Sequence, residues 1–284
     1  MNDALRAAEI FEQAATLNRE DPLRDASLLR FPNYGQLVMT GDLHGHRRNF
    51  QKLQRYCALD RFAARHVVLH ELIHEDVQTL TGRDMSFEIC LAAAEWKCAF
   101  PDQVHFLLSN HELAQVGQHE ITKNGRSVTA EFEKSVRQTY GGDADRVIRA
   151  MYEFIRSYPL AGRTANRVFL SHSLPGPRDV ARFDPSVLSR PPTSEDLRDG
   201  GSAHFLVWGR YQTQAVVDSL AELLDVDCFI CGHQPQETGY DIWHGRLVIL
   251  ASDHNHGVFL PIDLNKPISV ENLIRNIRPF AGVE

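Results

Sequence analysis

The sequence contains no long hydrophobic run. A helix that spans a bilayer needs about 20 mostly apolar residues in succession, and no apolar run in this chain reaches that length. Residues 1–21 are amphipathic and acidic, and they lack the apolar segment of a secretory signal. We therefore expect a cytoplasmic protein with no membrane partner.

Cysteine is scarce. The five cysteines are an odd number without a secretory signal, which indicates reduced thiols and not a disulfide framework. Cys228 and Cys231 spell C-x-x-C, but they lie in an apolar run that predicts a buried strand. Residues three apart on a strand point to opposite faces of the sheet. We therefore expect two buried core thiols here and no metal or redox site.

An excess of positive charge is also absent. The 30 lysines and arginines are outnumbered by 37 aspartates and glutamates, which gives a formal net charge of −7. Proteins that bind nucleic acid present a basic field to the phosphate backbone. We therefore expect no nucleic-acid partner.

Helical and strand patterns alternate along the chain. Helices are predicted over residues 3–19, 48–58, 86–99, 128–157 and 212–223. Strands are predicted over residues 35–46, 66–71, 104–113, 167–173, 204–208, 227–235, 246–254 and 257–264. This alternation indicates an α/β protein whose sheet is covered by helices. We divide it into an N-terminal helical extension, residues 1–33, and one domain, residues 34–284.

Metal-binding residue types follow five of the apolar runs. They stand at residues 41–45 (GDLHG), 70–71 (HE), 109–112 (SNHE), 171–172 (SH) and 231–233 (CGH). In an open α/β sheet the strand ends converge on one crevice, so these groups become neighbours there. Nitrogen and oxygen donors without a thiolate favour Mn, Fe or Zn.

Residues 70–74 spell H-E-L-I-H, which raises a second hypothesis. In zinc peptidases this pattern lies on a helix, because only helical i,i+4 spacing puts both histidines on one face. The residues before His70 are β-branched and strand-like. A zinc peptidase, with Glu95 as a candidate third ligand, stays an alternative.

The ordered series of motifs at residues 41–45, 110–112, 172 and 232–233 resembles the calcineurin-like metallophosphoesterases, particularly their phosphoprotein phosphatase (Ser/Thr protein phosphatase) branch. The likeness spans roughly residues 34–262. It implies a sandwich of two mixed β-sheets flanked by helices. It also implies a metal-dependent phosphoesterase acting on a phosphorylated protein or a small phosphorylated compound.

The resemblance further implies two divalent metal ions and eight site residues. The expected metal ligands are Asp42 and His44 for the first ion, Glu71 between the ions, and Asn110, His172 and His233 for the second. His111 would be the general acid that protonates the leaving oxygen. Arg210 would hold two phosphate oxygens with its planar guanidinium.

The second motif departs from the family pattern, Gly-Asp-x-x-Asp-Arg-Gly. It has His70 in place of the first glycine, Glu71 in place of the bridging aspartate, His74 in place of the second aspartate and Glu75 in place of the arginine. His74 removes the carboxylate that would orient His111, for which Glu75 or Asp76 would have to substitute. Glu75 would oppose a phosphate if it pointed inward. The rival hypothesis is therefore a non-catalytic relative that binds metal or a phosphorylated ligand.

Overall fold

The structure is a computed structural model that describes residues 3–75, 82–123 and 125–284. Its larger sheet runs in the order β1 (Arg24–Asp25), β2 (Leu28–Phe31), β8 (Ala161–Thr164), β9 (Val168–Ser171), β10 (Cys228–Cys231), β12 (Leu247–Leu250) and β11 (Tyr240–Trp243). The second sheet runs in the order β14 (Arg278–Pro279), β13 (Val258–Asp263), β3 (Gln36–Thr40), β4 (Arg65–Leu69) and β5 (Val104–Phe106). A separate hairpin pairs β6 (Thr122–Lys123) with β7 (Arg126–Ser127).

The two sheets face each other across an apolar core. Alternate side chains of each strand enter this core because successive side chains of a strand point to opposite faces. On β3, Leu37 and Met39 face the core between the sheets, whereas Val38 faces the helices outside. The expected sandwich of two mixed sheets flanked by helices is confirmed.

The C-x-x-C pair follows the same alternation. Cys228 lies in the core between the sheets and Cys231 in the core under the helices, and both are buried free thiols. The prediction of two core thiols on opposite faces is confirmed.

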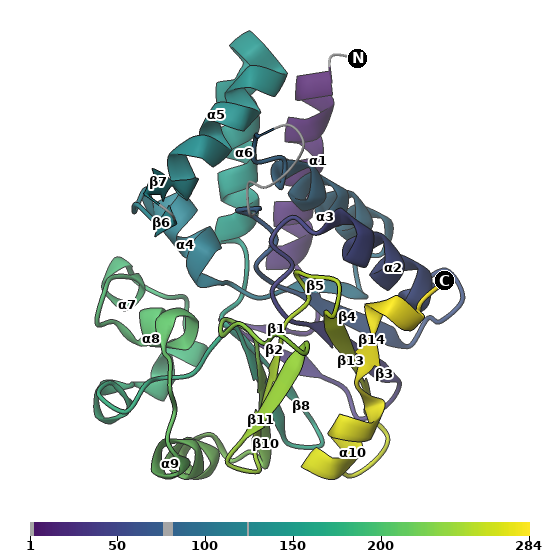
Figure 1. Cartoon of the computed structure of the whole chain (residues 1–284), viewed down its shortest axis with the longest axis vertical. Helices are drawn as coiled ribbons and strands as arrows, with labels where there is room; N and C mark the ends of the chain where they lie inside the picture. Colours follow the sequence, from purple (N-terminus) through teal and green to yellow (C-terminus); the bar gives the residue numbers. More distant parts are fainter. Residues whose placement is uncertain (1–2, 76–81, 124) are drawn as a thin grey trace.

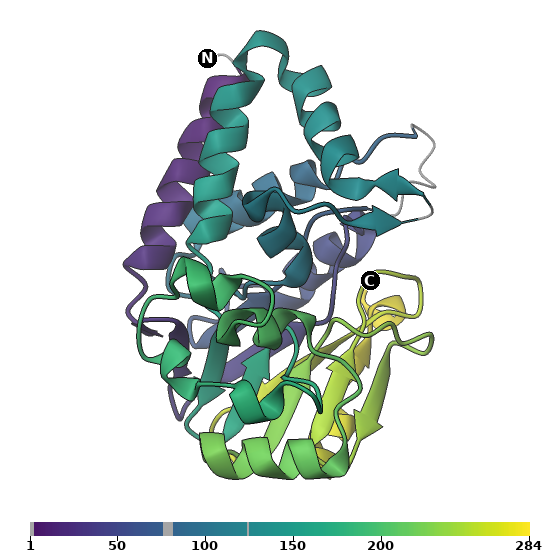
Figure 2. The same cartoon turned by 90° about the vertical axis from the view of Figure 1, so that its left-hand side faces the viewer.

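Helices cover the outer faces of both sheets. Figures 1 and 2 show α1 (Asp3–Arg19), α3 (Phe87–Ala99), α5 (Val128–Tyr140) and α6 (Ala144–Arg156) gathered beyond one end of the sandwich. In Figure 2, α9 (Gln214–Leu224) lies along the outside of the larger sheet. The remaining α-helices are α2 (Arg47–Cys57), α4 (Asn110–Gly117), α7 (Ser194–Leu197), α8 (Ser202–Trp208) and α10 (Val270–Asn276). Across the described ranges, no helix has the length and apolar character that a membrane span requires.

Two predicted strands are wrong. Residues 204–208 belong to helix α8, because a short continuous apolar run fits a buried helix as well as a buried strand. The strand predicted over residues 104–113 ends at Phe106, and α4 begins at Asn110. Ser109 caps α4 by accepting a hydrogen bond from the Glu112 amide.

The sequence patterns did not predict several short elements. They include β1, β2, β6, β7, β8, β14, α7 and α10, together with the break that divides residues 128–157 into α5 and α6.

The N-terminal segment packs closely onto the rest of the chain. Alanines and Phe11 form the buried face of α1, which contacts α3 and α6. Strand β2 then pairs in parallel with β8. The division of the chain at residue 33 stays a prediction, although residues 28–31 are part of the larger sheet.

A buried ion pair at Asp21 holds the N-terminal segment against the rest of the chain. The Asp21 Oδ2 atom accepts hydrogen bonds from Lys97 Nζ at 2.9 Å and from His105 Nδ1 at 2.8 Å. Lys97 and His105 are almost fully buried. A buried ion pair does not guarantee stability, but removing one partner leaves the other charge without compensation.

We expect Asp21→Ala to lower the free energy of unfolding by about 3–5 kcal/mol, because the Lys97 ammonium then stays buried without its anion. Urea unfolding measures this loss. Asp25→Ala is the control, since Asp25 pairs with Arg30 at the surface and such pairs contribute about 0–1 kcal/mol. Equal losses in the two variants would contradict the prediction.

The same loss should depend on pH. Burial alone would raise the pKa of Asp21, but His105 and Lys97 hold it well below its ordinary value. A carboxyl whose pKa is lower in the folded state stabilises the fold above its unfolded pKa of about 3.9. The difference between wild type and Asp21→Ala should therefore shrink progressively as the pH falls from about 5 toward 2.

Candidate active site

The expected site residues follow the ends of strands from both sheets. Asp42 and His44 come after β3, and Glu71 comes after β4. The other three expected ligands are Asn110 at the start of α4, His172 after β9 and His233 after β10. Because β3, β4 and β5 are parallel, as are β9 and β10, their carboxyl ends bring these residues together.

Four ligand atoms meet at the first of two adjoining clusters. Asn110 Oδ1 lies 2.7 Å from His172 Nε2 and 2.9 Å from His233 Nδ1. These two ring nitrogens are 3.1 Å apart, and Glu71 Oε2 is 2.9 Å from His172 Nε2. All four residues are nearly or fully buried. We call these four residues the inner cluster.

The inner cluster has more acceptors than protons. The oxygens of Asn110 and Glu71 can only accept, and each neutral imidazole carries one proton for its two nitrogens. In the described part of the chain, Glu71 Oε2, one of the four ligand atoms, is buried without a hydrogen-bond partner. Burying such atoms unpaired is costly. A shared cation would satisfy all four ligand atoms, so these residues fit a metal ion.

The second cluster lies around the other oxygen of Glu71. Glu71 Oε1 is 3.2 Å from His44 Nε2 and 3.7 Å from His111 Nε2. His44 Nδ1 lies 3.0 Å from the Ile73 carbonyl oxygen. Since a carbonyl only accepts, Nδ1 must donate, and Nε2 of a neutral His44 keeps its lone pair toward Glu71. The two oxygens of Glu71 thus face two separate sets of histidines.

Asp42 borders the same region and repels Glu71. Its carboxylate accepts the His233 backbone N–H at 2.9 Å. Burial, followed by the charge of Glu71, raises the pKa of Asp42 above its ordinary value. Burial would also raise the pKa of Glu71, but His172 and His111 outweigh it and hold that pKa well below its ordinary value. Two carboxylates so arranged favour a nearby positive charge.

Comparison with known proteins agrees with the architecture. No protein-family model and no curated protein matches the chain. One similar solved structure is a protein serine/threonine phosphatase from Saccharomyces cerevisiae, at 16% identity and a TM-score of 0.68, with 98% of this chain and 93% of that chain covered. Another is a cold-active protein-tyrosine phosphatase from a psychrophilic Shewanella species, at 15% identity and a TM-score of 0.61, with 93% and 82% covered.

The chain has the calcineurin-like phosphoesterase fold. The resemblance that the sequence motifs indicated is thereby confirmed for the architecture. Sequence identity at this level establishes the fold alone, and the activity has to be argued from the site.

The H-E-L-I-H segment is not helical. Residues 70–75 follow β4 as irregular backbone, and Glu71 and His74 have positive φ angles of 49° and 65°. The two histidines consequently point to different neighbours: His70 contacts His172, and His74 contacts His111. The zinc peptidase hypothesis is wrong, because its two ligands do not share one face.

His74 takes the place of a carboxylate beside His111. Its Nδ1 lies 2.8 Å from His111 Nδ1, and its Nε2 lies 2.6 Å from Gln115 Oε1. With Nε2 donating to Gln115, a neutral His74 accepts the proton of His111 Nδ1. His111 therefore has an oriented ring whose Nε2 faces Glu71. Its partner is a neutral imidazole, which stabilises a charged His111 less than a carboxylate would.

Glu75 points away from the inner cluster. Its Oε2 accepts the Met85 backbone N–H at 3.3 Å, in the segment that leads into α3. The inward-pointing charge that would oppose phosphate is therefore not found. Asp76, the other suggested substitute for the missing carboxylate, lies outside the described residues.

Glu112 supports the turn that carries the ligands. Its Oε1 accepts the Leu72 backbone N–H at 2.7 Å, which ties the start of α4 to the segment after β4. Ser109 also bonds to the Glu112 carboxylate. These contacts fix Asn110 relative to Glu71.

Arg210 lies just after α8 and is partly buried. Burial, His172 and the positive charge of Arg210 together lower the pKa of His233 well below its ordinary value. The charge of Arg210 thus acts on a residue of the inner cluster. The Arg210 side chain has no hydrogen bond or ion pair with the residues that the structure describes.

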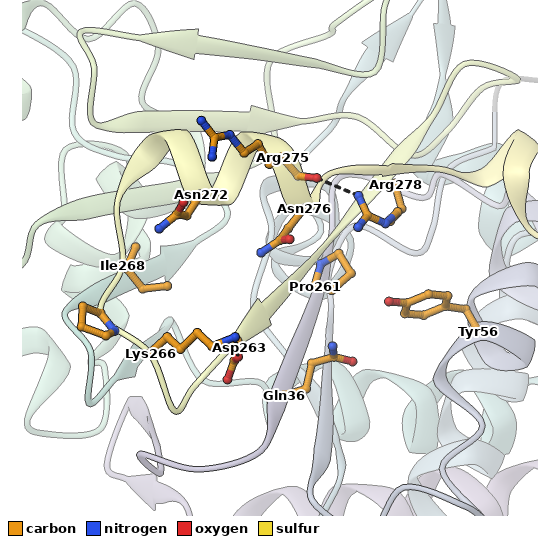
Figure 3. A pocket seen from close by; sticks show the side chains of 11 residues that line it. Gln36, Tyr56, Pro261, Asp263, Lys266, Ile268, Asn272, Arg275, Asn276 and Arg278 are labelled. Atoms are coloured by element: carbon orange, nitrogen blue, oxygen red, sulfur yellow. Dashed lines mark hydrogen bonds and ion pairs between the residues drawn. The ribbon is translucent and has the colours of Figure 1, made fainter.

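One pocket lies far from these residues. Figure 3 shows a cavity of about 420 Å³ beside β13 and α10, lined in part by Gln36, Tyr56, Arg275 and Arg278. Gln36 starts β3, whereas the site follows the other end of that strand. None of the eight expected site residues lines this pocket, so we do not assign the substrate to it.

His70 and Gly232 are the residues of this region that the sequence did not assign. Both residues belong to the groups that follow apolar runs. The family resemblance predicted no role for either, and it aligned His70 with a glycine. A Cβ atom on Gly232 would lie 2.2 Å from Asp42 Oδ1 and 2.5 Å from His70 Cε1. Glycine is therefore required where β10 ends.

We expect Gly232→Ala to lower the free energy of unfolding by about 1–3 kcal/mol, because overpacking displaces buried neighbours. Urea unfolding of the metal-free chain measures it. Gly142→Ala is the matched control, since an added Cβ meets nothing within 4 Å there. Unchanged stability in Gly232→Ala would contradict the predicted clash.

Proposed function

We propose that the chain is a metal-dependent phosphoesterase, similar to Ser/Thr protein phosphatases, that hydrolyses a phosphate ester at a dinuclear metal site. The observation that carries this proposal is the inner cluster, where four buried ligand atoms meet with too few protons to satisfy them. The phosphatase-like fold supports the same reaction class.

The proposed ligands divide between two ions. Asp42 and His44 would hold the first, Asn110, His172 and His233 the second, and Glu71 would offer one oxygen to each. Bound there, two divalent ions of Mn, Fe or Zn would supply hydroxide at neutral pH and clamp phosphate oxygens. The two separately directed oxygens of Glu71 support its bridging role despite its extra methylene group.

Two further residues, His111 and Arg210, would act on the substrate. His111 would give the Nε2 proton to the leaving oxygen, held in place by His74. Arg210 would pair with phosphate oxygens, because its guanidinium is not engaged by the described residues and its charge reaches His233. The substrate class is a phosphorylated protein or a small phosphorylated compound. A cytoplasmic location and the absence of nucleic-acid and membrane partners stay predictions.

The second candidate function is binding without catalysis. The observation that favours it is the neutral imidazole of His74 beside His111, where a carboxylate would better support proton donation. Such a protein would bind metal or a phosphorylated ligand through the same residues.

We expect two metal ions per chain and metal-dependent hydrolysis of p-nitrophenyl phosphate. His111→Ala should lower kcat by about 10²–10⁴-fold, the usual contribution of a general acid or base, without loss of metal. Elemental analysis and turnover in Mn, Fe and Zn series measure both. His256→Ala, at an exposed loop histidine, should match wild type.

Two other results are informative. Two bound ions without turnover on any phosphate ester would favour the binding protein over the enzyme. A chain that binds none of the three metals would contradict both functions.

The effect of changing residue 74 should depend on the leaving group of the substrate. A p-nitrophenolate leaves without a proton, whereas a serine alkoxide needs one. With an anionic partner for His111, His74→Asp should raise kcat on a phosphoserine peptide by about tenfold relative to p-nitrophenyl phosphate. His74→Asn, without the charge, is the matched control. Equal changes on both substrates would contradict this role for position 74.

A further inference from the structure

His70 is a fully buried histidine whose ring lies between a backbone carbonyl and a proposed ligand. Its Nε2 is 2.8 Å from the Thr40 carbonyl oxygen, at the end of β3. Its Nδ1 is 2.9 Å from His172 Nδ1, after β9. His70 thus connects the two sheets directly behind the inner cluster.

The protons along this chain of contacts can be counted. The Thr40 oxygen can only accept, so His70 Nε2 must donate to it. A neutral His70 then has no proton on Nδ1, which accepts from His172 Nδ1–H. A neutral His172 with its proton on Nδ1 keeps its lone pair on Nε2. That nitrogen is the one that lies 2.7 Å from Asn110 Oδ1 and 2.9 Å from Glu71 Oε2.

Packing keeps the His70 ring in this orientation. Gly232 approaches so closely that even a Cβ atom there would lie 2.5 Å from His70 Cε1. The rings of His70 and His172 meet edge to face, with centroids 5.2 Å apart. Since the hydrogen bond at one imidazole nitrogen sets the chemistry of the other, a fixed His70 controls His172.

We propose that His70 is a positioning residue, which holds the proton of His172 on Nδ1 and so directs the His172 Nε2 lone pair at the metal. Its relevance to catalysis rests on the proposed function, whereas the hydrogen bond itself does not. A different arrangement is chemically available, because Asp42, His70 and His172 could themselves surround an ion. His70 Nδ1 could bind such an ion only if His172 Nδ1 had lost its proton.

The test compares wild type with His70→Leu and His70→Asn, using ¹⁵N-histidine NMR and zinc titration. In wild type, metal-free and zinc-loaded, we expect a proton on His172 Nδ1 and a scalar coupling from that nitrogen to His70 Nδ1. His70→Leu should weaken zinc binding about 10–100-fold, the usual effect of losing such a partner. His70→Asn should retain most of the affinity, because its amide oxygen can accept from His172.

Three results would overturn the proposal. One is a zinc-loaded wild type with the His172 proton on Nε2, and another is equal zinc affinity in wild type and His70→Leu. The third is a zinc stoichiometry that falls in both variants, which would make His70 a ligand. If His70→Leu does not fold, the wild-type NMR spectra and the zinc affinity of His70→Asn test the proposal. If wild type binds no zinc, the titration is made with Mn and Fe; a chain that binds none of the three metals contradicts the proposed function, while the metal-free coupling still tests His70.

Discussion

The shortage of protons at the inner cluster is the constraint on which the site depends. Asn110, Glu71, His172 and His233 direct acceptor atoms at one another inside a buried space. With the His172 proton on Nδ1, the group has fewer donors than acceptors, and burial makes the deficit costly. A cation resolves it, which relates the packing of the two sheets to the proposed chemistry.

The rebuilt second motif follows one physical rule at both of its histidines. His70 and His74 each place Nε2 against an oxygen, from Thr40 or Gln115, and each turn Nδ1 toward another histidine. Both therefore act on a neighbouring ring and not as a shared pair of zinc ligands. Glu71 stands between them in the sequence and directs its two oxygens to the two clusters.

The supports of the site are spread over the chain. Ser109 and Glu112 fix the start of α4, and Gly232 leaves room for Asp42 and His70. Farther away, Asp21 joins the N-terminal segment to α3 and β5 through Lys97 and His105. Position 21 matters to the site only through the fold, since it touches none of the proposed ligands.

Local patterns in the sequence determined the class of fold and the order of the ligand motifs. Strand periodicity is local, so it correctly placed Cys228 and Cys231 on opposite faces. The donor types after each strand indicated a metal site without thiolates. Short apolar runs fit helix or strand equally well, which is why the strand predicted over residues 204–208 is wrong.

Only the tertiary structure decided which nitrogen of each histidine faces which partner. His70 and His172 are separated by 102 positions, and no pattern in either segment encodes their contact. It arises from the packing of the two sheets and from the irregular backbone after β4, where Glu71 and His74 have positive φ angles. The letters H-E-L-I-H are compatible with a helix, but after β4 these residues follow an irregular path with two left-handed positions. The chemistry of the motif therefore depends on contacts with distant residues.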